Sequence, residues 1–360
     1  MNTSSWARGV LAIAFLFSGA AAAPPAKPGA PASVPKPLDV PDGGLVAAGK
    51  APELELLYTG DVIGYLEDCG CKLNPAGGLA KRAWLVNQLK TNYPQTPLVL
   101  LDSGNFADNP SEIGDLRTAA LLDFMAKLGY KVVNVGERDL TLGYDDFIQR
   151  TKDLKMDFIS TNIVKQGSKS TVFPPYAIVE VKGTSGKPVK IGVMGVIRYS
   201  PVWQKAGPAG DNLGVAGPEE MVQLVLSEVR AKSDIVVLLA AVSKEDAHDI
   251  AKSAPQIDFI LGSYGGIYNT LEESEGPVRI LYTGNQGKRI GESRIDLDAK
   301  RRVADVTSYM HFLTARFPDD KAMAAAVADA KAKIGGPAAA DAKPAEALKP
   351  IGATPAPGGH

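Results

Sequence analysis

Histidine is scarce in this sequence. The 360 residues include only three, His248, His311 and His360, and they stand far apart along the chain. Because imidazole is a favoured ligand of zinc, iron and nickel, so few histidines argue against a metal centre built from several of them. We expect His248 to lie on a helix without holding a metal, His311 to be a half-buried residue of the last strand, and His360 to belong to a tail.

The sequence also lacks an excess of one charge and long apolar runs. The 39 Lys and Arg and the 40 Asp and Glu give a formal net charge of −1, and they form no block of like charges. A basic stripe for nucleic acid and a polybasic membrane-surface segment are therefore not indicated. Beyond the N-terminal region, no apolar run reaches the ~18 residues of a membrane span. We expect neither nucleic acid nor, after removal of a signal peptide, a membrane as a partner.

The sequence has only two cysteines, Cys69 and Cys71. Their single-residue separation would close a very small loop, which restricts the unfolded chain too little to stabilise the fold. A chemical role therefore explains them better than a structural one.

The N-terminus has the three parts of a secretory signal peptide. Arg8 supplies the positive charge, residues 9–17 form a short apolar core, and residues 18–23 are small. The apolar core is too short to span a membrane and is followed closely by Pro24 and Pro25. We therefore predict a signal peptide over residues 1–23 and a periplasmic or secreted mature protein.

Two stretches rich in Pro, Ala and Gly enclose the part of the chain that has apolar periodicity. They cover residues 24–50 and 335–360. Such composition predicts a linker and a disordered tail, respectively. Between them we expect one α/β domain over residues 53–315 and a helix over residues 316–334.

Short apolar runs alternate with amphipathic stretches through the first half of this domain, which predicts parallel strands covered by helices. In the last third strand follows strand, which predicts antiparallel pairing. Both halves fit a four-layer αββα sandwich with mixed sheets. Strands are expected at residues 54–59, 98–102, 132–135, 158–161, 176–181, 190–195, 235–240, 259–262, 278–283, 290–297 and 303–312, and helices at residues 79–91, 115–128, 144–154, 218–232, 244–253 and 319–334.

Five of the predicted strands end in polar or glycine-rich turns. In α/β sheets the loops after the carboxyl ends of the strands carry the functional residues. We therefore expect the site to be formed by residues 59–61, 102–105, 136–139, 241–243 and 262–266.

These five loops, in this order and at this spacing, resemble those of the calcineurin-like metallophosphoesterases, above all the bacterial periplasmic 5′-nucleotidase branch. That branch has Asp-x-His after the first strand, then a Gly-Gly-Leu-Ala helix start, which residues 77–80 match. Its later loops are Asp-x-Gly-Asp, Gly-Asn-His-Glu and two histidine-containing turns. The resemblance implies the αββα fold and a family chemistry in which two metal ions clamp a phosphate ester.

The resemblance also shows which metal ligands have been replaced. Asp61 matches the first carboxylate, Asn105 stands at the bridging Asp, and Glu137 and Arg138 stand at the Asn and His of the third loop. Four further positions of family histidines hold other residues, namely Ile63, Ala241, Tyr264 and Gly266. The comparison therefore implies loss of the two-metal centre.

Two interpretations of the remaining polar residues stay open. In the first, a single hard divalent cation is bound by Asp61, Asn105, Glu137 and Asp139, because carboxylate and amide oxygens suit such ions. In the other, Arg138 occupies the old metal site, where it either pairs with a carboxylate or binds an anion such as phosphate. An unpaired buried charge is costly, so we expect Arg138 to pair with Asp61 or Asp139.

The run from Glu67 to Cys71 resembles a bacterial subgroup of 5′-nucleotidase-like proteins, some of which carry selenocysteine in this loop. The resemblance implies redox chemistry at Cys69 and Cys71. A Cys-x-Cys disulfide closes a small, strained ring, and strained disulfides are readily reduced. We expect Lys72 and the helix that opens near Gly77 to lower a thiol pKa. A copper or zinc clip on the two sulfurs, or two idle thiols, are the alternatives.

Three functions follow from these observations. The first is an exported 5′-nucleotidase-like protein without the two-metal centre, in which Cys69, Cys71 and Arg138 are the reactive residues. Its partner would be a small molecule or a thiol of unidentified structure. The second is a residual metal-dependent phosphoesterase with a remodelled site. The third is a binding scaffold without catalysis.

Overall fold

A computed structural model describes residues 50–140, 143–199, 213–263 and 272–335, all within one compact unit. The predicted signal peptide, nearly all of the predicted linker and tail, and Tyr264, Gly266 and His360 lie outside these ranges. Within them, no helix is long and apolar enough to cross a membrane.

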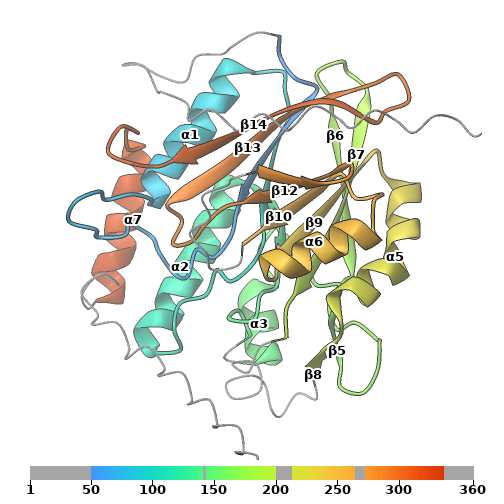
Figure 1. Cartoon of the computed structure of the whole chain (residues 1–360). Helices are drawn as coiled ribbons and strands as arrows, with labels where there is room; N and C mark the ends of the chain where they lie inside the picture. The colour runs from blue at the N-terminus through green and yellow to red at the C-terminus, as the bar shows by residue number, and fades with distance from the viewer. Residues whose placement is uncertain (1–49, 141–142, 200–212, 264–271, 336–360) are drawn as a thin grey trace, which may run out of the picture. The chain divides into compact units, whose positions relative to one another are not determined.

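The first sheet has six strands in the order β14-β13-β1-β2-β3-β4. Figure 1 labels β13 and β14, which lie side by side. Strands β1 to β4 run parallel, β13 runs antiparallel to β1, and β14 runs antiparallel to β13. The bounds are β1 Leu54–Thr59, β2 Leu98–Asp102, β3 Tyr130–Asn134, β4 Asp157–Ile159, β13 Arg289–Leu297 and β14 Val303–Phe312.

The second sheet has the order β11-β12-β10-β9-β7-β6. Its four central strands run parallel, and the edge strands β6 and β11 run antiparallel to their neighbours. A small separate pair joins β5 to β8. The bounds are β5 Ile163–Lys165, β6 Tyr176–Lys182, β7 Pro188–Ile197, β8 Leu213–Val215, β9 Ile235–Ala241, β10 Phe259–Gly262, β11 Glu272–Glu275 and β12 Val278–Tyr282.

Helices cover the outer face of each sheet, and apolar side chains fill the space between the layers. Alternate residues of β1, such as Leu56 and Tyr58, join Val193 and Leu239 of the second sheet in a central core. Leu57 faces the other way, toward the helices that cover the first sheet. The bounds are α1 Leu79–Asn92, α2 Glu112–Leu128, α3 Tyr144–Thr151, α5 Pro218–Lys232, α6 Lys244–Ser253 and α7 Lys321–Ile334. The predicted αββα sandwich with mixed sheets is confirmed.

Several details differ from the prediction. Helix α7 begins at Lys321 rather than residue 319, because the Asp320 side chain accepts a hydrogen bond from the Met323 amide and caps it. This helix is not simply a surface element, since Val327 is buried against the core. Strand β12 runs parallel to β10, not antiparallel.

The sequence also missed strands β5, β8 and β11. The first two have only three residues each, too few to show a period. Strand β11 has the sequence EESE, whose polar side chains show no alternation with apolar ones, so the pattern does not predict a strand. Charge of this kind is typical of an edge strand, where it discourages pairing with another chain.

Candidate functional site

The first three strands of the first sheet end at the same edge, which brings their loops together. The amide of Asp61 donates to the carbonyl of Gly104 at 2.9 Å, and that of Ile63 donates to the carbonyl of Asn105 at 3.2 Å. The third loop joins them, because Asp139 accepts a hydrogen bond from the Asn105 amide at 2.9 Å. The structure therefore gathers Asp61, Asn105 and Asp139 as the strand-end pattern suggested.

The backbone of these loops is held in an unusual conformation. Asp61, Ile63 and Asn105 have φ values of 48°, 53° and 60°, in the left-handed region that non-glycine residues rarely adopt. A Cβ on Gly136 would lie 2.3 Å from the Asn105 amide nitrogen. Such strain is concentrated at functional sites, where the surrounding structure enforces it.

Asn105 joins the first and third loops through its side chain. Its Nδ2 donates to Asp61 Oδ1 at 2.9 Å, and its Oδ1 accepts from the Arg138 backbone amide at 3.2 Å. The residue is 3% exposed, so these bonds form away from water. An aspartate could not donate to Asp61, so the carboxamide performs a task that the family's bridging carboxylate could not.

Asp139 holds the same loops from the other side. Its Oδ2 accepts from the amides of Asn105 and Gly136, at 2.9 and 2.7 Å, and its Oδ1 accepts from the Ala107 amide at 2.9 Å. Burial raises the Asp139 pKa to about 7, although the three amides act in the opposite direction. Both oxygens therefore serve the loop backbone.

Asp102 has a similar structural role at the end of β2. Its carboxylate accepts hydrogen bonds from Thr59 Oγ1 at 2.5 Å and from the Gly104 amide at 2.9 Å. Burial raises the Asp102 pKa to about 6.

The prediction that Arg138 pairs with Asp61 or Asp139 is wrong for the described residues. Its Nε donates to the Ala107 carbonyl at 3.3 Å, and its Nη2 donates to Asn109 Oδ1 at 2.7 Å. The physical reason is that the Asn105 carboxamide already donates to Asp61 and backbone amides already donate to Asp139. The guanidinium therefore binds Ala107 and Asn109 instead.

Glu137 also points away from the loop centre. Its Oε2 lies 3.9 Å from the Nε of Arg198, in an ion pair. Of the four residues expected to hold a single cation, Glu137 thus faces a cation of the protein itself.

The donor set does not fit the two-metal clamp that the fold family implies. The Asn105 carboxamide and both Asp139 oxygens are engaged in hydrogen bonds, and Ile63 and Ala241 carry no side-chain ligand atom. Among the described residues, no three His, Cys, Asp or Glu side chains are grouped to hold a metal ion. The sequence places no imidazole at Tyr264 or Gly266 either.

A cavity beside Asp139 has a volume of only about 20 Å³, and Ala107 and Phe147 are among the residues that line it. That space suffices for about one water molecule. A drug-sized ligand occupies a pocket of at least about 300 Å³.

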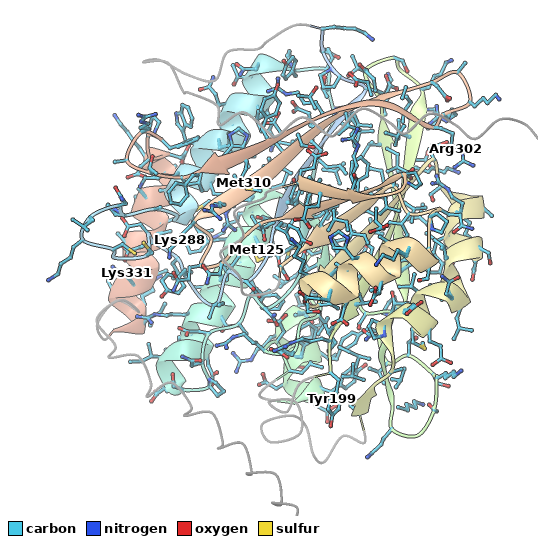
Figure 2. All side chains as sticks on the ribbon, in the orientation of Figure 1. Met125, Tyr199, Lys288, Arg302, Met310 and Lys331 are labelled. Carbon is cyan, nitrogen blue, oxygen red and sulfur yellow. The ribbon has the colours of Figure 1, made fainter. Side chains whose placement is uncertain are left out.

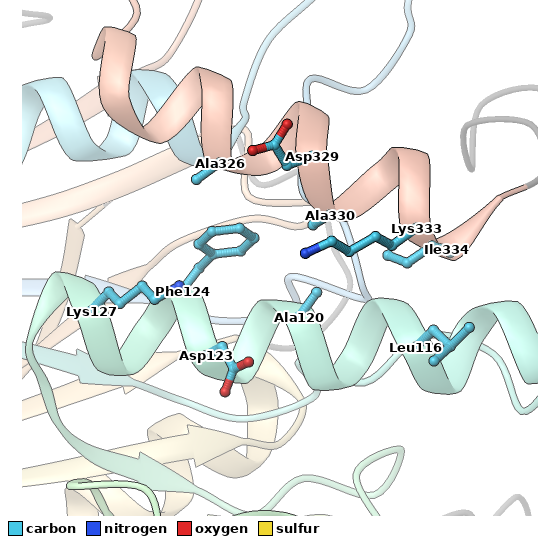
Figure 3. Close-up of a pocket in the computed structure, with 10 residues that line it drawn as sticks. All are labelled: Leu116, Ala120, Asp123, Phe124, Lys127, Ala326, Asp329, Ala330, Lys333 and Ile334. Atoms are coloured by element: carbon cyan, nitrogen blue, oxygen red, sulfur yellow. The ribbon is translucent and has the colours of Figure 1, made fainter.

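A larger hollow lies elsewhere, between α2 and α7 (Figure 3). Its volume is about 430 Å³. Phe124 and Ile334 contribute apolar surface, and charged side chains come from both helices, among them Lys127 and Lys333 (Figure 3). Among the described residues of the strand-end loops and of the cysteine run, none lines this groove, so it is separate from the candidate site.

The cysteine run forms a tight turn just before α1. The Cys69 amide donates to the Ala76 carbonyl at 2.9 Å, and Asp68 and Gly77 form an isolated β-bridge. Gly70 has a φ of 64°, and its amide donates to Asp68 Oδ1 at 2.9 Å. Glu67, at the start of the run, forms an ion pair with Lys331 of α7. Lys331 is labelled in Figure 2.

The two thiols are free but differ in their surroundings. Cys69 is buried, with 8% of its surface exposed, whereas Cys71 is exposed. Burial opposes ionisation of Cys69, but hydrogen bonds from the Cys71 thiol and from backbone amides, with the charge of Lys288, lower its pKa overall. The hydrogen bond with Cys69 raises the pKa of Cys71.

The cation that acts on the thiols was not the one predicted. Lys72 is exposed, whereas Lys288, in the loop between β12 and β13, lowers the pKa of both sulfurs electrostatically (Figure 2). Sequence reasoning missed Lys288 because more than 200 residues separate it from the cysteines. The signal was the polar turn before β13, because β13 pairs antiparallel with β1 and begins beside the end of β1, which the cysteine run follows.

That turn links the cysteine run to the strand-end loops. The Gln286 amide donates to the Asp61 carbonyl at 2.7 Å, and its side-chain Nε2 donates to Tyr65 Oη at 2.8 Å. Burial raises the Tyr65 pKa, and the charges of Asp108, Cys69 and Cys71 add to the effect. The thiols therefore lie at the rim of the region where Asp61 and Asn105 meet.

The expectation for His311 is wrong, because it is fully buried rather than half-buried. Its Nε2 lies 2.6 Å from Glu292 Oε2, and Arg294 donates to the other oxygen of Glu292 at 2.6 Å. Glu55 lies 3.5 Å from Arg294. This buried ionic cluster binds β1, β13 and β14 together. The expectation that His248 lies on a helix is correct, and its ring nitrogens contact Glu273 and Glu275.

Comparisons with known proteins agree with this architecture. No family model matches the chain. A 2′,3′-cyclic-nucleotide 2′-phosphodiesterase/3′-nucleotidase from Haemophilus influenzae is 28% identical over a region that covers 56% of this chain. That region spans only 33% of the curated relative's length.

Two solved structures extend the comparison over most of the chain. A 5′-nucleotidase precursor from Thermus thermophilus has a TM-score of 0.66 at 20% identity, covering 78% of this chain and 59% of that one. The calcineurin-like phosphoesterase YfkN from Bacillus subtilis has a TM-score of 0.66 at 18% identity, covering 79% and 98%. The chain therefore has the fold of the 5′-nucleotidase-like, calcineurin-like phosphoesterases.

Proposed function

We propose that this chain is an exported protein that uses a 5′-nucleotidase-like fold for thiol–disulfide exchange rather than for two-metal hydrolysis. Cys69 and Cys71 are the exchanging sulfurs. The observation that carries the proposal is their asymmetric arrangement, in which a buried thiol with a lowered pKa lies beside an exposed thiol with a raised pKa. Differences of this kind in thiol pKa and access govern exchange rates.

Export supports this chemistry. The signal-peptide pattern of residues 1–23 would send the chain to a compartment where disulfides persist. The sequence has no third cysteine, so neither sulfur has another intrachain partner. In the net reaction two substrate thiols are oxidised to a disulfide while the Cys69–Cys71 disulfide is reduced to two thiols. The reverse reaction uses a substrate disulfide as the oxidant.

The named relatives are nucleotidases or phosphoesterases, which makes residual hydrolysis the main rival. That rival requires metal ligands at the strand-end loops. The bonds of Asn105 to Asp61 and of Asp139 to three backbone amides weigh against it, because a metal would compete with all of them. The Cys69 and Cys71 sulfurs alone also make a poor copper or zinc site, since structural zinc sites have four ligands.

A redox titration tests the proposal. The mature chain is equilibrated in glutathione buffers of graded potential, and free thiols are then alkylated and counted by mass spectrometry. We expect Cys69 and Cys71 to convert reversibly between dithiol and disulfide with a midpoint above about −270 mV, within the range of known exchange proteins. A pair that stays reduced in every oxidising buffer, or oxidised under strong reductant, would contradict the proposal. Tight stoichiometric copper or zinc binding that Cys69→Ser abolishes would favour the metal clip instead.

A further inference from the structure

The two sulfurs of the cysteine run differ in whether another molecule can reach them. Cys71 is exposed to solvent, whereas Cys69 is 8% exposed and its amide is bound to the carbonyl of Ala76. An incoming thiolate must approach the sulfur that it attacks along the disulfide axis, so access decides which sulfur forms the mixed disulfide.

We infer that Cys71 is the sulfur that exchanges with the substrate, and that Cys69 is the sulfur that leaves and returns. The inference rests on the proposed thiol–disulfide function and assigns the order of its steps. It also defines the substrate class as thiols that can reach an exposed turn, such as glutathione or a surface cysteine of another protein.

The surroundings of Cys69 suit a leaving group. Although burial opposes its ionisation, the pKa of Cys69 is lowered overall, and the backbone hydrogen bonds from Ala76 and Cys71 and the charge of Lys288 are causes that do not depend on a free Cys71 thiol. A thiol of lower pKa leaves faster from a disulfide. In the dithiol the pKa of Cys71 is raised, first by the hydrogen bond with Cys69 and further by the charge of Asp68. The Asp68 charge remains in the disulfide and makes Cys71 the poorer leaving group of the pair.

Exchange at Cys71 needs only two substrate thiolates and water. A substrate thiolate attacks Cys71 Sγ, the Cys69–Cys71 bond breaks, and Cys69 departs with the electron pair as a thiolate. Attack of a second substrate thiolate on the substrate sulfur then releases the Cys71 thiolate, which takes a proton from water. If no second thiolate arrives, the Cys69 thiolate attacks Cys71 and expels the first one unchanged.

Lys288 is a positioning residue in this scheme, because it acts on the substrate only through the two sulfurs, whose pKa values its charge lowers. Lys288→Met removes the charge, and Lys288→Arg keeps it. We expect Lys288→Met to move the pH profile of Cys69 alkylation to higher pH and to slow reduction of the disulfide, because a thiol of higher pKa leaves more slowly. Lys288→Arg should restore both. An unchanged pH profile in Lys288→Met would overturn this role.

Trapping the mixed disulfide tests the assignment. The oxidised mature chain is mixed with reduced glutathione, quenched in acid, and alkylated, and the peptide that ends at Lys72 is fragmented on either side of Gly70. We expect glutathione on Cys71 and the alkyl group on Cys69. The single variants provide a second measurement, in which Cys69→Ser should accept glutathione from its disulfide at least tenfold faster than Cys71→Ser.

The outcomes separate the inference from the function on which it rests. Glutathione found on Cys69, or faster capture by Cys71→Ser, would overturn the order of steps while leaving thiol exchange intact. Failure of the unaltered chain to form any Cys69–Cys71 disulfide would overturn both.

Discussion

The replacement Asn105→Asp tests whether hydrogen bonds, rather than metal ions, hold the strand-end loops. In the native chain the Asn105 Nδ2 lies 2.9 Å from Asp61 Oδ1 and donates to it. The variant places a carboxylate oxygen there instead, so two negative charges meet in a buried position. The Arg138 amide, which faces the other oxygen, is satisfied by either side chain.

The magnitude follows from the distance. Two unit charges separated by the 2.9 Å of this contact repel by about 6 kcal/mol at an effective dielectric constant of 20. Proton uptake limits the loss, because protonating a carboxylate with a pKa near 3.9 costs about 4 kcal/mol at pH 7. We therefore expect Asn105→Asp to lower the free energy of unfolding by about 3 to 4 kcal/mol at pH 7.

The loss should depend on pH in a defined direction. The introduced carboxyl has its pKa raised in the folded state, so the variant is disfavoured only where the unfolded chain ionises it. The deficit should be small near pH 4 and grow as the pH rises toward the raised pKa. Urea unfolding of the full mature chain at pH 4 and pH 7, in the presence of a chelator, measures both values.

Asn109→Asp is the matched control. Asn109 is exposed, and its Oδ1 accepts from Arg138 Nη2 at 2.7 Å. The same chemical change there keeps the acceptor and faces a cation, so stability should change by less than about 0.5 kcal/mol. If Asn105→Asp were as stable as the native chain at pH 7, or if manganese made it more stable than the native chain, the hydrogen-bonded description of the site would be refuted.

Three further predictions concern other parts of the chain. Glu55 has its pKa raised to about 8, first by burial, so its contribution to stability is present below about pH 4.5 and lost as the pH rises to 8. In urea unfolding, the free energy of unfolding of Glu55→Gln should fall less steeply between pH 4.5 and pH 8 than that of the native chain. An equally steep fall in the variant would contradict the raised pKa of Glu55. Closing the Cys69–Cys71 disulfide should change the free energy of unfolding by less than about 1 kcal/mol, because so short a loop restricts the unfolded chain little; a large difference between oxidised and reduced chains would contradict this. The mature protein should begin at or near Ala23 or Pro24, and N-terminal sequencing of exported material that still began at Met1 would disprove it.

The arrangement of the strand-end loops could be predicted because it depends on a general property of parallel sheets. Once apolar runs mark the strands, their carboxyl ends must meet at one edge, which brought Asp61, Asn105 and Asp139 together correctly. The replacements at Ile63 and Ala241 needed only alignment of the loops. Short-range pattern and topology were sufficient for these features.

Side-chain direction and long-range charge could not be predicted in the same way. Arg138 turns to the rim because backbone and carboxamide donors had already reached the carboxylates, and a sequence does not reveal such competition. Lys288 acts on cysteines more than 200 residues earlier because it directly precedes β13, which pairs antiparallel with β1 and begins where β1 ends. The burial of His311 depends on Glu292 and Arg294, which approach it only after β13 and β14 pair.

Our central proposal, that this chain does not perform two-metal phosphate chemistry, is tested most directly by a hydrolysis assay on the purified mature chain. Nucleotides and a generic phosphomonoester are supplied with manganese or zinc, and the native chain is compared with Asp61→Ala. The account predicts negligible metal-stimulated turnover in both, because the bonds of Asn105 and Asp139 engage the groups that would bind metal. Robust turnover in the native chain that vanishes in Asp61→Ala would contradict it.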